Sequence, residues 1–202
     1  DGPAVAVGLV ERARTGSGIA QGEMAASVVT GYGRVRYAEA DAELSEITCH
    51  ARGARHLVPD ARTVIDIGGQ DSKLIRLDES GAVRDFAMND RCAAGTGRFL
   101  EVVATRLEAS LVEMGAMAES CRDPAAISSM CVVFAETEIV GLMAAGETRS
   151  RIAAGVQRAI AGRVAAMAGR TIDPPVVFAG GVALQPGMAQ ALEAALGLPV
   201  ET

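Results

Sequence analysis

Four cysteines are the first residues in this chain whose type and spacing could support chemistry. They are Cys49, Cys92, Cys121 and Cys131. No CxxC pair occurs among them, so the sequence contains neither a local zinc ribbon nor a thioredoxin-type redox site. In a chain predicted to be cytosolic, such thiols are reduced, bind a metal or pack as small hydrophobes, rather than form disulfides.

Two of these cysteines, Cys92 and Cys131, stand at the entrances to predicted helices. A helix N-terminus stabilises negative charge, so both positions suit thiolate ligands. An iron–sulfur cubane needs four thiolates, and two copies of the chain related by a two-fold axis would supply them. Spacing alone favours two buried structural thiols over cluster ligands. A cluster bound by all four cysteines of one chain is disfavoured, because Cys49 lies in a separate predicted helix and Cys121 precedes a turn.

Three glycine-rich stretches form the second set of candidates. Gly68 and Gly69 end a predicted strand, and the stretch around them also carries the carboxylates Asp66 and Asp71. Glycines at a strand end let the backbone approach an anionic ligand and direct N–H groups toward it. The two carboxylates could hold Mg²⁺ directly or through water. This stretch therefore predicts a phosphate site with a divalent cation.

The other two stretches lie further along the chain. Gly95, Thr96 and Gly97 stand immediately before a predicted helix, where free N–H groups and the helix dipole favour phosphate. Gly180 and Gly181 follow a second buried strand and have no charged neighbours, which suits a flat purine-like group. Each stretch alone could be an ordinary tight turn, and none matches the Walker A or Rossmann pattern. Their order along the chain is the informative feature.

The elements that must position these residues alternate between strand and helix, which predicts an α/β fold. The predicted helices cover residues 2–14, 45–57, 97–107, 131–144, 152–167 and 186–196, and the predicted strands cover residues 26–30, 63–67, 74–77, 82–88 and 176–179. A change of pattern near residue 60 predicts a domain boundary there.

Composition narrows the class of protein. The 202 residues are 50% hydrophobic and 22% charged, a globular balance that excludes intrinsic disorder. The net charge of -6 argues against nucleic acid as a partner, because neutralising phosphates requires a basic face. No apolar run approaches ~18 residues and no charged-then-apolar leader opens the chain. The sequence therefore predicts a cytoplasmic protein that binds neither nucleic acid nor membrane.

The order of the glycine stretches resembles the actin-like, Hsp70-like and sugar-kinase ATPase superfamily. Three longer motifs resemble the BadF/BadG/BcrA/BcrD ATPase family, which contains activators of 2-hydroxyacyl-CoA dehydratases and ATP-binding subunits of benzoyl-CoA reductase. They are VIDIGGQDSK at 64–73, NDRCAAGTGRFLE at 89–101 and CVVFAE at 131–136. TGYGR at 30–34 and EITCHA at 46–51 extend the similarity over nearly the whole chain.

This resemblance implies a two-lobed, RNase H-like ATPase fold. Residues 1–60 would be a remnant of the first lobe, and residues 61–202 would form the second lobe with the cluster-binding helices and the adenosine loop. The first phosphate loop of the D-x-G-S-T type, carried by the family's N-terminal hairpin, and the family's C-terminal end have no counterpart in the sequence.

The resemblance also implies roles for the candidate residues. Asp66 and Asp71 would organise Mg²⁺ and water, and Cys92 and Cys131 would bind one [4Fe-4S] cluster between the subunits of a homodimer. The residues expected to hold ATP or ADP are Gly68, Gly69, Gln70, Gly95, Thr96 and Gly97 at the phosphates, and Gly180 and Gly181 at the adenosine.

The implied function is ATP-driven electron transfer. A reduced ferredoxin or flavodoxin would load the cluster, and the electron would pass to a partner dehydratase or reductase acting on a CoA thioester. Two alternatives remain open at this stage. A sugar kinase of the same superfamily would need the glycine stretches without the paired thiols. A non-catalytic dimerisation module would explain the missing first phosphate loop.

Overall fold

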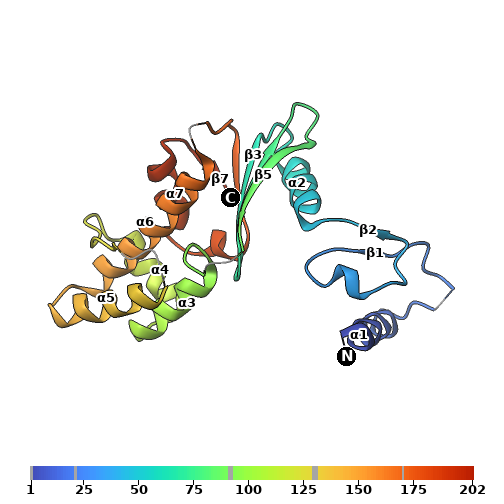
Figure 1. Cartoon of the computed structure of the whole chain (residues 1–202), viewed down its shortest axis with the longest axis horizontal. Coiled ribbons are helices and arrows are strands. Elements are labelled where there is room, and N and C mark those ends of the chain that lie inside the picture. The colour runs from blue at the N-terminus through green and yellow to red at the C-terminus, as the bar shows by residue number, and fades with distance from the viewer. Residues whose placement is uncertain (1, 21, 91–92, 129–131, 170) are drawn as a thin grey trace. The chain divides into compact units, whose positions relative to one another are not determined.

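The computed structural model describes residues 2–20, 22–90, 93–128, 132–169 and 171–202 (Figure 1). The chain divides into two compact units, Asp1–Gly53 and Ala54–Thr202. The division lies inside helix α2 (Glu46–Leu57), a few residues before the boundary predicted near residue 60. No helix in the described parts of the chain is long and apolar enough to cross a membrane.

The first unit contains little regular structure. It begins with α1 (Gly2–Gly16), and its two short strands β1 (Val28–Val29) and β2 (Ala42–Glu43) pair in parallel, with the 3₁₀ turn η1 (Arg34–Arg36) between them. The Asp41 carboxylate accepts hydrogen bonds from the N–H and hydroxyl of Ser27, which lowers the pKa of Asp41. The strand predicted at 26–30 is shorter than expected, because Val28 is exposed and contributes no apolar burial.

The second unit is built on a five-stranded mixed sheet in the order β5-β4-β3-β6-β7. Its strands are β3 (Thr63–Ile67), β4 (Ser72–Leu77), β5 (Val83–Asn89), β6 (Val176–Ala179) and β7 (Val200–Glu201). β3, β4 and β5 form an antiparallel meander, whereas β6 runs parallel to β3 and β7 runs parallel to β6. The strands predicted at 63–67 and 176–179 are confirmed residue for residue.

Helices cover one face of this sheet (Figure 1). They are α3 (Gly97–Arg106), α4 (Leu111–Glu119), α5 (Val132–Ala144), α6 (Arg149–Ala168) and α7 (Met188–Leu196), with the 3₁₀ turn η2 (Gly181–Leu184) before α7. The core on this face contains Ile65, Leu74 and Phe178, which are aligned across three strands, together with Val156 and Ile160 of α6. The predicted α/β class is confirmed.

Helix α4 was not predicted from the sequence. It begins with a capping box, in which the Ser110 hydroxyl accepts from the Glu113 N–H at 3.2 Å and the Glu113 carboxylate accepts from the Ser110 N–H at 2.8 Å. These bonds from Ser110, the backbone one first, lower the pKa of Glu113. The S-x-x-E spacing at 110–113 was the signal that could have revealed this helix.

Candidate active site

Two of the predicted glycine stretches leave the sheet at the same edge. β3 and β6 are parallel neighbours with Asp66 opposite Ala179, so Gly68 and Gly180 follow the two strands side by side. Gly180 has a φ of +89°, and a Cβ at this position would lie 2.4 Å from the carbonyl oxygen of Ile67. Only glycine allows the two strand ends to approach this closely.

The third glycine stretch docks on the first. The Gly97 N–H donates to the Gly68 carbonyl at 2.8 Å, and the Arg98 N–H donates to the Gly69 carbonyl at 2.9 Å. The fully buried Thr96 hydroxyl donates to the Ala93 carbonyl at 2.7 Å. The Thr96 hydroxyl and the Gly97 N–H, two groups predicted to serve phosphate, thus each have an acceptor within the protein. The Gly97 and Arg98 bonds join the start of α3 to the first glycine loop, whereas the Thr96 bond closes the turn before α3.

All three stretches line one pocket of about 190 Å³. Each stretch contributes one glycine to the lining: Gly69, Gly97 and Gly181. The remaining lining residues are Leu100, Glu101, Leu111, Val182 and Gln185. These five residues, three apolar and two polar, were not predicted as site residues. Leu100 and Glu101 lie on α3, Leu111 begins α4, Val182 lies in η2, and Gln185 directly follows η2. Four of the five lie within four residues after the glycines at 97 and 181.

Five of the residues predicted to hold the nucleotide are not among the pocket's lining residues: Gly68, Gln70, Gly95, Thr96 and Gly180. Gln70 is exposed next to Gly69. Gly95 is buried with a φ of +94°, and a Cβ at this position would lie 3.0 Å from the Cδ atom of Arg163 on α6. Gly95 therefore allows the turn before α3 to pack closely against α6.

The two predicted carboxylates lie together and share a buried cation. Lys73 Nζ is 2.6 Å from Asp71 Oδ1 and 3.4 Å from Asp66 Oδ2, and all three side chains are less than one-tenth exposed. Asp66 and Lys73 are register partners across β3 and β4. Lys73 was not predicted as a site residue, because its place opposite Asp66 follows from the pairing of β3 with β4, and the predicted strand began only at residue 74. The ammonium group compensates charge that would otherwise be costly to bury.

This donor set suits Mg²⁺ in type, because carboxylate oxygens are the ligands that hard divalent cations prefer. Within the described residues, no group of three or more His, Cys, Asp or Glu side chains is placed to hold a metal ion. The pair Asp66 and Asp71 could thus supply at most part of a coordination shell, with phosphate and water oxygens supplying the rest.

Both predicted cluster ligands, Cys92 and Cys131, lie outside the described residues. The helices that follow them in sequence, α3 and α5, contact each other, and Arg106 on α3 forms an ion pair with Glu136 on α5. The other two cysteines carry free thiols. The Cys49 Sγ lies 3.5 Å from the Thr30 hydroxyl, and Cys121 lines a separate cavity of about 390 Å³ among α4, α6 and α7.

Comparison with known proteins identifies the family. Residues 4–202 match the BadF/BadG/BcrA/BcrD ATPase family. The chain belongs to this family. The activator of lactoyl-CoA dehydratase from Anaerotignum propionicum is 48% identical over 181 residues, which cover 89% of this chain and 70% of that protein. A benzoyl-CoA reductase subunit from Thauera aromatica is 37% identical over 149 residues, covering 72% of this chain and 52% of that protein.

A solved structure shows the same fold. The activator of 2-hydroxyisocaproyl-CoA dehydratase from Clostridium difficile, with bound ADPNP, superimposes with a TM-score of 0.86 at 40% identity, covering 95% of this chain and 72% of that one. The resemblance to the BadF/BadG/BcrA/BcrD family and the actin-like ATPase fold predicted from it are therefore confirmed.

Proposed function

We propose that this protein is an ATP-dependent activator that delivers a low-potential electron to a dehydratase or reductase acting on a CoA thioester. One observation carries the nucleotide part of the proposal: three glycine stretches far apart in sequence line a single pocket, at the edge where β3 and β6 end. Ligands of open α/β sheets bind at such carboxyl ends of parallel strands. Relatives named as dehydratase activators support the remainder.

Within this pocket, the apolar side chains of Leu100, Leu111 and Val182 provide a surface for the adenine ring. Glu101 and Gln185 provide hydrogen-bonding groups for the ribose or the base. Gly69 and Gly181 let the backbone approach the nucleotide, with Gly181 on the adenosine side and Gly69 on the phosphate side.

The phosphate end of the nucleotide would be served by Asp66 and Asp71. Their carboxylates would orient Mg²⁺ and its water ligands, and Lys73 would hold both carboxylates in place. Gly97 would act by letting α3 pack on the first loop, because its N–H donates to Gly68. The dipole of α3 would still favour phosphate charge near its N-terminus.

For the redox part, we propose that Cys92 and Cys131 of two chains bind one [4Fe-4S] cluster between them. The motifs around these cysteines and the contact between α3 and α5, the helices that follow them, support this arrangement. A cluster, once bound, stores one electron from a reduced ferredoxin or flavodoxin. ATP binding and hydrolysis would move the helices that carry the ligands, and thereby permit transfer to the partner enzyme.

The nucleotide proposal is tested by calorimetric titration with ATP and ADP in the presence of Mg²⁺. A Cβ at Gly181 meets nothing within 4 Å, so the Gly181→Val substitution is expected to fold while reducing the volume available to a ligand. Gly162→Val is the matched control, because its Cβ also meets nothing within 4 Å and Gly162 lies on α6 away from the pocket. We expect binding to weaken at least tenfold in Gly181→Val only. Equal binding in both variants would contradict this pocket assignment.

The cluster proposal is tested by anaerobic purification with iron and sulfide analysis. One [4Fe-4S] cluster per dimer corresponds to about two iron atoms per chain. Cys92→Ser and Cys131→Ser should each lose the iron and the cluster's absorption, whereas Cys49→Ser and Cys121→Ser, the matched controls, should keep them. Retention of a full cluster in the first pair of variants would refute the electron-transfer proposal.

A further inference from the structure

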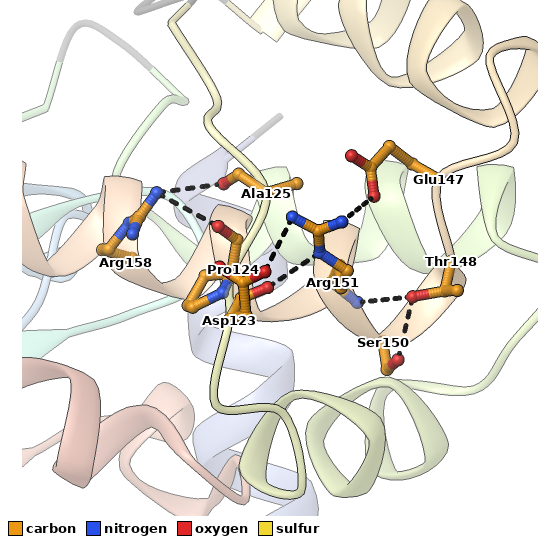
Figure 2. Close-up of polar contacts among 8 residues, drawn as sticks. All are labelled: Asp123, Pro124, Ala125, Glu147, Thr148, Ser150, Arg151 and Arg158. Atoms are coloured by element: carbon orange, nitrogen blue, oxygen red, sulfur yellow. Dashed lines mark hydrogen bonds and ion pairs between the residues drawn. The ribbon is translucent and has the colours of Figure 1, made fainter.

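The segment that joins α4 to α5 is fastened to α6 by two arginines (Figure 2). Arg151 donates from Nε to the Asp123 carbonyl at 2.9 Å and forms an ion pair with the Asp123 carboxylate at 3.0 Å. The Ala125 N–H in turn donates to the Arg151 carbonyl at 2.9 Å. Residues 123–125, here named the clamped segment, are therefore bound through both backbone and side chain.

Arg158 holds the far end of the clamped segment. Its Nη2 donates to the carbonyls of Ala125 at 3.1 Å and Pro124 at 3.4 Å (Figure 2). Gly155 lies beneath this contact, where a Cβ would come within 2.4 Å of the Ala125 carbonyl oxygen. Ala125 is buried. The clamped segment thus has one close-packed register on α6, and a shift of α6 would carry the segment with it.

Gln157, the residue before Arg158 on α6, contacts the turn that precedes α7. Gln157 is 2% exposed, and its Nε2 donates to the Pro186 carbonyl at 2.8 Å. The next residue, Gly187, lies against Gln157, because a Cβ there would come 2.7 Å from the Gln157 Oε1. On the other side of Pro186, Gln185 lines the glycine pocket and donates to the Leu111 carbonyl of α4. Gln157 therefore contacts the two residues that directly follow Gln185, a lining residue of the pocket.

We propose that α6 couples the occupancy of the glycine pocket to the clamped segment, with Gln157 and Arg158 as the positioning residues. Gln157 moves with the 185–187 turn to which it is hydrogen-bonded, and Arg158 holds residues 124–125. Because both residues belong to the same turn of α6, a displacement of one is transmitted to the other. Three residues after the clamped segment, the Ser128 N–H and hydroxyl donate to the Glu138 carboxylate of α5, so the coupling reaches the helix that follows Cys131 in sequence. Coupling of this kind is reciprocal: nucleotide alters the segment, and the segment alters nucleotide affinity. The inference rests on the proposed nucleotide site.

Hydrogen exchange of the intact protein tests this coupling, with and without saturating ADP and Mg²⁺. In the wild-type protein, ADP should change exchange rates in peptides covering residues 121–128 at least about fivefold, the lower end of typical coupling. Arg158→Ala and Gln157→Met should reduce this nucleotide-dependent change to less than about twofold. A purely structural role would alter exchange equally with and without ADP. The matched control is Arg149→Ala, because Arg149 on the same helix donates to the Glu108 carbonyl instead.

Calorimetry separates the two levels of the proposal. Arg158 is exposed and does not line the glycine pocket, so Arg158→Ala is expected to fold and to bind ADP within a few-fold of the wild-type affinity. The coupling is overturned if ADP binds without changing hydrogen exchange in residues 121–128, or if it changes this exchange as much in Arg158→Ala as in the wild-type protein. Either result leaves the nucleotide site intact. Failure of the wild-type protein to bind either nucleotide overturns both.

Discussion

Replacing Lys73 by methionine tests the role of the buried charges behind the glycine pocket. The substitution nearly keeps the length of the side chain and removes the ammonium group that contacts both Asp66 and Asp71. Lys73 is 3% exposed, so its loss leaves two carboxylates in a site that water scarcely reaches. Breaking a buried ion pair by removing one partner costs about 3–5 kcal/mol of folding free energy.

The matched control is Arg84→Met. Arg84 forms an ion pair with Asp173 at 3.0 Å, similar in length to the Lys73 contacts, but both side chains are about half exposed. Exposed pairs contribute about 0–1 kcal/mol, because water and salt screen them. Urea unfolding should therefore show a loss about 3 kcal/mol larger for Lys73→Met than for Arg84→Met. Equal losses in the two variants would refute the view that Lys73 compensates buried charge.

Two further predictions concern backbone and capping. Gly180→Ala should lower the free energy of unfolding by about 2–5 kcal/mol, because the positive φ is strained and the Cβ meets the Ile67 carbonyl. Gly181→Ala, whose Cβ meets nothing within 4 Å, should lower it by under about 1 kcal/mol. Chemical denaturation of the two variants measures the difference. The bonds from Ser110 lower the pKa of Glu113 below its ordinary value of 4.5, so its stabilising effect is present above about pH 4.5 and lost on acidification. The difference in thermal midpoint between wild type and Glu113→Gln should accordingly shrink below that pH, and a constant difference would contradict this.

Local sequence signals predicted most of the elements correctly. The β-branched runs at 63–67 and 176–179 predicted two strands with the bounds that the structure gives them. Helix α6 extends beyond the predicted range because Thr148 caps it earlier, where its hydroxyl accepts from the Arg151 N–H. Helix α4 was missed because its apolar pattern is weak, although its capping box was present in the sequence.

The sequence also identified candidate residues but not their partners. Asp66 and Asp71 were predicted as a pair, whereas the ammonium of Lys73 between them follows from the pairing register of β3 and β4. Thr96 and Gly97 stay predicted phosphate residues, and the structure adds that their hydrogen bonds go to Ala93 and Gly68. A local pattern shows which groups can donate a hydrogen bond, and long-range packing decides which acceptor they reach.

The sequence alone determined the family and the order of the glycine stretches, and it predicted Cys92 and Cys131 as the cluster ligands. Those properties reside in residue type and local spacing, which need no knowledge of distant contacts. Only the tertiary structure decided that glycines 69, 97 and 181 line one pocket, and that neighbouring residues of α6 contact both the turn after Gln185 and the clamped segment. The pocket depends on the parallel pairing of β3 with β6, between residues more than one hundred positions apart.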